Sequence, residues 1–147
     1  MIMGFVNKTI LKELIIFVLY HFKHEKISIG KLNNLIYFID INHFYYNFES
    51  ITSIDYICKE SGPTSFVITE LLEDMSKCKE INVSNANQNT QFLELCLKNN
   101  QIKTNLLSLS ERKEITIICD RFRYISNEEL TRIIRKQKPW MACRPNE

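Results

Sequence analysis

The chain of 147 residues contains only three glycines and three prolines. The glycines, Gly4, Gly30 and Gly62, are too far apart to build a P-loop or a G-x-G-x-x-G turn, in which exposed backbone N–H groups hold nucleotide phosphates. We therefore expect no nucleotide site, and no other cofactor is indicated.

The sequence also lacks a pattern of paired cysteines. The five cysteines are odd in number, are widely spaced and form no C-x-x-C motif. This pattern matches neither a disulfide framework nor a zinc knuckle. We therefore expect reduced thiols and a cytoplasmic location. The cysteines are Cys58, Cys78, Cys96, Cys119 and Cys143.

Long apolar runs are absent as well. The N-terminal run covers only residues 14–20, whereas a transmembrane helix needs about 20 apolar residues. No small-residue cleavage site follows it, as a signal peptide would require. We expect no membrane partner and interpret the run as part of an amphipathic core helix. Its apolar side is formed by Leu11, Leu14, Ile15, Val18, Leu19 and Phe22.

The formal net charge is only +2, but it is unevenly distributed. Residues 1–97 carry 8 Lys/Arg and 11 Asp/Glu, a net of −3, whereas residues 98–147 carry 11 and 6, a net of +5. Nucleic-acid-binding proteins usually show a stronger and more concentrated basic patch, so a nucleic-acid partner is less favoured than a solvated face. The basic residues concerned are Arg121, Arg123, Arg132, Arg135, Lys136, Lys138 and Arg144.

Four residues could in principle hold a metal ion or form a catalytic pair. His21 and His24 lie three residues apart on one expected helix, as do Asp40 and His43 on the next. No H-E-x-x-H motif and no G-x-S-x-G turn accompanies them. We therefore expect no metal site and no enzyme, and we favour a structural hydrogen bond between Asp40 and His43 over a catalytic role.

Periodicity and capping signals predict a mainly α (α+β) fold: a single compact helical domain over residues 1–147, of five to six helices with a small antiparallel β insertion. Ser110 is the expected N-cap of the fourth helix, and Pro63 is expected in the first turn of the third, after Ser61 or Gly62. A half-buried strand is expected at 51–58 and a hairpin at 81–97. The expected helices cover 7–23, 31–45, 63–79, 110–122 and 127–137.

An ordered set of short motifs runs through the chain. It begins with Lys31-Leu32, Leu35 and Tyr37. It continues with Asp40, His43, Ile51-Thr52, Tyr56 and Gly62-Pro63. It ends with Leu109-Ser110-Glu111, Leu130-Thr131 and Pro139-Trp140. The set resembles the Panacea domain, whose members show K-L-x-K-L-x-Y, D-x-x-H, P-I-T and Y-G-P in this order. Asn34 replaces a lysine of that pattern, Ser61 replaces a tyrosine, and the glycines usual after the histidine are missing.

The resemblance implies an antitoxin of a bacterial or prophage toxin-antitoxin system, which neutralises its cognate toxin by direct protein contact without making or breaking a bond. An aromatic cluster, Phe44, Tyr45, Tyr46 and Phe48, is of the type that anchors protein interfaces, although core packing is the simpler interpretation. Self-association stays open. The alternative function is a nucleic-acid-binding transcriptional regulator, with a helix-turn-helix formed by residues 110–122 and 127–137.

Overall fold

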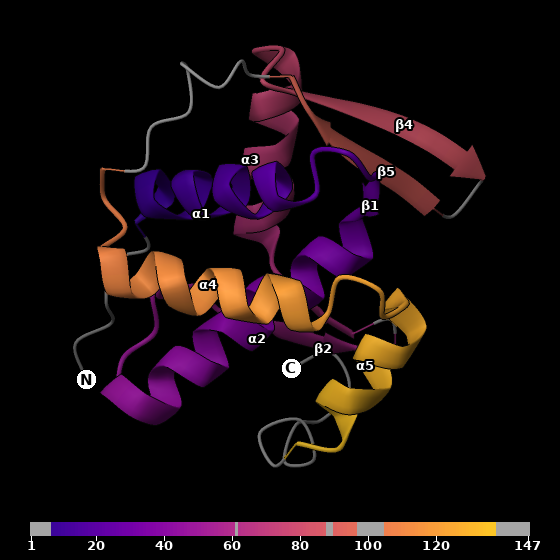
Figure 1. Cartoon of the computed structure of the whole chain (residues 1–147). Helices are drawn as coiled ribbons and strands as arrows, with labels where there is room; N and C mark the ends of the chain where they lie inside the picture. The colour runs from indigo at the N-terminus through magenta and orange to yellow at the C-terminus, as the bar shows by residue number, and fades with distance from the viewer. Residues whose placement is uncertain (1–6, 61, 88–89, 97–104, 138–147) are drawn as a thin grey trace.

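In the computed structural model, the other elements lie around a long central helix (Figure 1). The structure describes residues 7–60, 62–87, 90–96 and 105–137. The hairpin formed by β4 (Ile81–Asn87) and β5 (Thr90–Leu95) extends away from the helices. The elements are α1 (Lys8–His21), β1 (Ile27–Ser28), α2 (Ile29–Asn47), β2 (Ile57–Lys59), β3 (Gly62–Thr64), α3 (Phe66–Lys77), β4 (Ile81–Asn87), β5 (Thr90–Leu95), α4 (Leu109–Arg121) and α5 (Asn127–Arg135).

Helix α2 is the centre of the fold, because it contacts α1, α4, α5 and the strands β1, β3 and β5. It begins after Ser28, whose side chain accepts a hydrogen bond from the Lys31 backbone N–H. Four of its apolar residues, spaced i, i+3, i+4 and i+7 along one helical face, are fully buried. These are Leu32, Leu35, Ile36 and Ile39.

Helix α1 also follows its predicted pattern, since all six residues of its expected apolar side are buried. It contributes one buried carboxylate as well. Glu13 accepts hydrogen bonds from the backbone N–H groups of Leu106 and Leu107, at 3.0 and 2.6 Å to its Oε2 atom. This contact fixes the segment before α4 against α1, and α1 and α4 pack together.

Two small antiparallel sheets complete the fold, one in the order β1-β5-β4 and one made of β2 and β3. The expectation of a hairpin within residues 81–97 is confirmed, because β4 and β5 pair in antiparallel fashion. Strand β4 is longer than the expected 81–83, because the polar residues 84–87 continue it past an irregularity between Asn85 and Asn87. Strand β1 was not expected, and it pairs with only Phe92 and Leu93 of β5.

Three local expectations are wrong. Residues 51–56 form no strand, and only Ile57–Lys59 is extended as β2. Pro63 lies in β3 opposite Cys58 instead of in a helix, since proline is tolerated in a short edge strand. Helix α3 therefore begins later, with Ser65 as its N-cap. For α4 the N-cap is Ser108 rather than Ser110, which lies inside the helix.

The cysteines differ from the expectation of reduced thiols in one respect, because Cys58 is disulfide-bonded. Cys78, Cys96 and Cys119 are free thiols, and burial raises the pKa of the Cys119 thiol to about 12. Among the described helices, none is long and apolar enough to cross a membrane. The mainly α fold with a small antiparallel β content is confirmed.

Candidate functional site

Asp40 joins the middle of α2 to the segment that follows the helix. Its Oδ1 atom accepts hydrogen bonds from the backbone N–H groups of Ile51 and Thr52, at 3.0 and 3.1 Å. Its Oδ2 atom accepts from the hydroxyls of Thr52 and Tyr56, the latter at 2.6 Å. One buried carboxylate therefore holds the three motif positions that the sequence places after the helix.

The pKa of Asp40 is raised from its usual value of 3.8, because desolvation by burial outweighs the hydrogen bonds from Thr52, Tyr56 and Ile51, which lower it. The pKa of Tyr56 is also raised, by burial first and then by the nearby Asp40 carboxylate. The Tyr56 ring packs edge-on against Tyr37, with ring centroids 5.1 Å apart. These groups form a dense buried cluster on one side of α2.

The expected hydrogen bond between Asp40 and His43 is wrong. His43 Nδ1 lies 2.9 Å from the Glu114 carboxylate on α4, and Asn42 donates to the other oxygen of the same carboxylate at 2.8 Å. Three residues on a helix span most of one turn, so Asp40 and His43 can each reach a different neighbouring element. His43 ties α2 to α4, whereas Asp40 ties α2 to the following segment.

His21 and His24 do not come together with this pair. At the end of α1, His21 Nδ1 donates to the Phe17 carbonyl at 2.8 Å, and its Nε2 lies 3.1 Å from the Thr116 hydroxyl. His24 is exposed. Within the described ranges, no group of three His, Cys, Asp or Glu residues is placed to bind a metal ion.

Position 62 favours glycine because α2 approaches the backbone closely there. Its φ of 115° is one that residues with a side chain rarely adopt, and a Cβ atom there would lie 2.5 Å from Asn34 Oδ1. Asn34 is fully buried and donates to Asn127 Oδ1 at 2.6 Å and to Thr131 Oγ1 at 2.9 Å. The asparagine that replaces the family's lysine therefore joins α2 to α5 beneath β3.

Lys31 is half-buried, and its Nζ donates to the Arg123 carbonyl at 2.9 Å in the connection between α4 and α5. Desolvation by burial lowers its pKa. Leu32, Leu35 and Tyr37 are buried in the core. Pro139 and Trp140, like Lys138 and Arg144, lie outside the described residues. The family-motif residues that the structure describes are thus mainly contacts that hold elements together.

The aromatic cluster lies at the C-terminal end of α2 and is not core. The four side chains are exposed, with Tyr45 at 76% and Phe48 at 84%. Tyr45 and Tyr46 contact each other edge-on, with ring centroids 5.1 Å apart. Phe48 ends the helix with a φ of 60°, in the left-handed region that favours glycine. The cluster of Phe44, Tyr45, Tyr46 and Phe48 is called the aromatic end of α2 below.

A second surface feature was missed from the sequence, namely a hollow of about 770 Å³ near the start of α2. Buried Asn33 contributes to its lining. The signal for it was the pair Asn33-Asn34 inside an otherwise apolar helical run, because asparagine is unfavourable inside helices unless its side chain has a specific role. Glu114 was also missed, and the contact of Thr52 with Asp40 was not predicted, since nothing local links them to His43 or Asp40.

Comparison with known proteins gives a family match. The family model "Antitoxin SocA-like, Panacea domain" matches residues 32–141, which is three quarters of the chain. No curated protein and no solved structure matches the chain. The matched range begins in the first turns of α2 and includes the Asp40 cluster, Gly62 and the aromatic end of α2. The chain therefore belongs to the SocA-like antitoxin family that carries the Panacea domain.

Proposed function

We propose that this chain neutralises a cognate bacterial or prophage toxin by binding it directly, with the aromatic end of α2 at the centre of the contact. Membership of an antitoxin family supports the general role. The proposal includes no catalytic step: the toxin is blocked or held in an inactive conformation. Neutralisation by binding alone requires only a surface that can exclude water from a large apolar contact.

The observation that carries the proposal is the exposure of four consecutive or nearly consecutive aromatic residues on one helix end. Aromatic residues supply much of the binding energy at protein interfaces. Phe48 adds to this argument, because a non-glycine residue in the left-handed region costs about 1 kcal/mol. A bulky apolar side chain that is both exposed and held in an unfavourable backbone conformation does not serve the stability of the fold.

Co-expression tests the proposed function directly. Each gene adjacent to that of this chain is expressed alone and together with it, and growth is followed. We expect one neighbour to arrest growth and this chain to relieve the arrest. If no neighbouring gene is toxic, or if the arrest persists in the presence of this chain, the proposed function is wrong.

Phe48→Gly separates binding from folding. Glycine adopts a φ of 60° without strain, so we expect the variant to be more stable to urea by about 1 kcal/mol, while toxin neutralisation weakens. Phe66→Ala is the control, because Phe66 is also an exposed aromatic residue but belongs to a different helix, at the start of α3. Full rescue by Phe48→Gly combined with Tyr45→Ala would exclude the aromatic end as the contact.

The alternative, a nucleic-acid-binding regulator, has weaker support. In a helix-turn-helix, residues at the start of the second helix approach the DNA. Helix α5 begins with Asn127 followed by the exposed acidic residues Glu128 and Glu129, which repel phosphates. A gel-shift measurement on promoter DNA at low salt distinguishes the two functions: a shift that weakens steeply with added salt would favour the alternative.

A further inference from the structure

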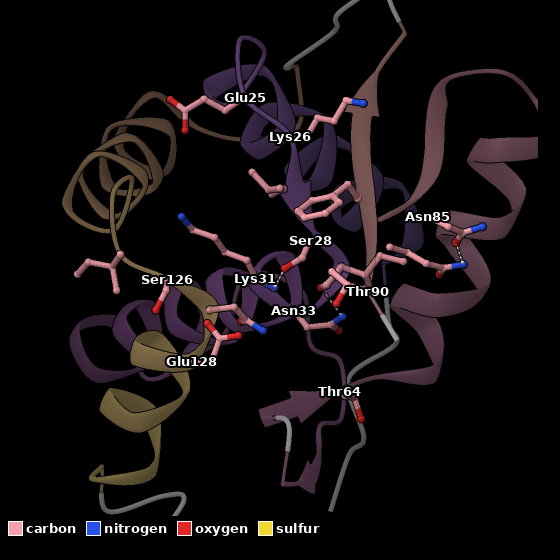
Figure 2. Close-up of a pocket in the computed structure, with 17 residues that line it drawn as sticks. Glu25, Lys26, Ser28, Lys31, Asn33, Thr64, Asn85, Thr90, Ser126 and Glu128 are labelled. Atoms are coloured by element: carbon pink, nitrogen blue, oxygen red, sulfur yellow. Dashed lines mark hydrogen bonds between the residues drawn. The ribbon is translucent and has the colours of Figure 1, made fainter. Parts of the chain in front are cut away.

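The hollow missed from the sequence lies at the N-terminal end of α2, where several elements meet (Figure 2). Residues from β1, the start of α2, the start of α5 and the Thr90 end of β5 line it. Figure 2 shows Ser28, Asn33 and Thr90 near the middle of the view, with Ser126 and Glu128 toward α5. Its volume of about 770 Å³ is within the range of ligand sites.

Asn33 lines the hollow and carries a buried hydrogen-bond acceptor that has no partner. Its side chain is only 5% exposed, and its Nδ2 donates to the Ile29 carbonyl at 2.9 Å. The carbonyl can only accept, so this bond fixes which side of the amide carries the oxygen. The Oδ1 atom has no hydrogen-bond partner. A buried acceptor without a partner is unfavourable by about 1–3 kcal/mol, which is why such groups in native proteins call for an explanation.

Strand β5 extends past the end of its pairing with β1, at the wall of the hollow. Strand β1 pairs with Phe92 and Leu93, and then the chain leaves the sheet because α2 begins at Ile29. Thr90 and Gln91 continue β5 past that point and line the hollow. Successive strand residues direct their backbone groups to alternate sides, so one of these two residues presents an N–H and a C=O where β1 has ended.

The charges of the hollow favour an uncharged occupant. Glu25, Lys26, Lys31 and Glu128 line it and sum to zero formal charge. Both helix starts already have caps, because Ser28 accepts from the Lys31 N–H and Ser126 accepts from the Glu129 N–H. An anion such as phosphate would find neither a net positive site nor a full set of free helix N–H groups.

We propose that the hollow binds an extended, uncharged peptide segment of a partner protein. The segment adds to β5 beside Thr90 and Gln91, in the place that β1 leaves open, and donates one backbone N–H to Asn33 Oδ1. Strand addition of this kind takes its affinity from main-chain hydrogen bonds. The proposal does not depend on the partner being a toxin.

The first experiment uses peptides as the probe. A displayed library of random peptides of about ten residues is selected on the full chain, and the enriched peptides are synthesised and titrated into isotope-labelled protein. We expect enriched sequences with uncharged central residues, and NMR shift changes concentrated at the Asn33 side-chain amide, Thr90 and Gln91. Methylation of single peptide nitrogens should weaken binding at every second position, because alternate N–H groups face the strand.

Asn33→Leu is the decisive variant. It removes the unpartnered acceptor with little change in volume, so we expect the melting temperature to stay the same or rise, while peptide affinity falls by about tenfold. Asn42→Leu is the matched control: it is the same substitution on the same helix, but Asn42 bonds Glu114 on α4 and does not line the hollow. Its peptide affinity should be unchanged.

Four outcomes would overturn the proposal. These are a selection that enriches no peptide, shift changes at the aromatic end of α2 instead of the hollow, methylation effects without alternation, and unchanged affinity of Asn33→Leu. Because the readout is peptide binding by the purified chain, failure here leaves the toxin-rescue result standing as a separate measurement.

Discussion

At the scale of single residues, Asp40 shapes the segment that follows the central helix. Four donors from residues 51, 52 and 56 converge on its two oxygen atoms. Sequence spacing correctly placed Asp40 on α2 but paired it with His43, because both lie on one helix. The choice of partner depends on which elements pack on each side of the helix, and local sequence carries no information on that.

Substitution of Asp40 tests this role. Asp40→Ala leaves buried donors without an acceptor, and we expect a loss of about 3 kcal/mol in the free energy of unfolding. Asp40→Asn keeps one oxygen for the two backbone N–H groups, so we expect a loss of about 1 kcal/mol. Urea unfolding measures both, and equal losses for the two variants would contradict the assigned hydrogen bonds.

The pH dependence of the same residue has a defined sign. Because the pKa of Asp40 is raised in the folded state above 3.8, the native protein holds this proton more tightly than the unfolded chain. The stability from this group is fully present below 3.8 and is lost as pH rises through the native pKa. As pH rises from 3.8 through the native pKa, we expect the unfolding free energy of the wild type to fall relative to that of Asp40→Asn. A relative rise would mean that the hydrogen bonds outweigh desolvation.

Gly62 and Gly30 give a matched pair of residues in contact with asparagine side chains. A Cβ at Gly62 would meet Asn34 at 2.5 Å and also require a φ of 115°, whereas a Cβ at Gly30 would meet Asn127 Nδ2 at 2.6 Å. We expect Gly62→Ala to destabilise by about 2 kcal/mol, because strain and crowding add. Gly30→Ala should lose clearly less, since only a side chain must move. Thermal unfolding compares them, and equal losses would rule out a backbone effect at Gly62.

At the scale of elements, the periodic pattern of apolar residues was sufficient to predict helices. The contacts between elements could not be predicted from the sequence. The apolar side of α1 was predicted correctly because burial on one helix face imposes a repeat on the sequence. Residues 51–56 were misassigned because they take their shape from a carboxylate on α2. Pro63 was misassigned because the cue for a helix start also fits a short edge strand, whose pairing depends on Cys58.

The start of α4 offers an element-scale prediction. Ser108 accepts from the Glu111 N–H at 3.0 Å, and Glu111 accepts from the Ser108 N–H at 2.8 Å, which is a capping box. We expect Ser108→Ala to destabilise by about 1 kcal/mol and Ser110→Ala, an exposed position inside the helix, by less than about 0.5 kcal/mol. Chemical denaturation of both variants decides between the two serines, and the reverse order would place the cap at Ser110.

At the scale of the whole molecule, the two candidate binding surfaces lie at opposite ends of α2. The helix has 19 residues, which corresponds to a length of about 28 Å. The hollow beside Asn33 is at its start, and the aromatic end is at its finish. Contacts of Asn34, Asp40 and His43 hold the helix between them. These contacts thus fix the middle of α2 against its neighbours, whereas its aromatic end is exposed.

Calorimetric titration of the purified chain with the product of the neighbouring gene that it rescues tests the central claim most directly. We expect direct binding by the wild type, and an affinity lower by about 30-fold or more for the double variant Tyr45→Ala, Phe48→Gly, since an interface hot spot contributes about 2 kcal/mol. Growth rescue without measurable binding, or equal affinity of wild type and double variant, would contradict neutralisation through the aromatic end of α2.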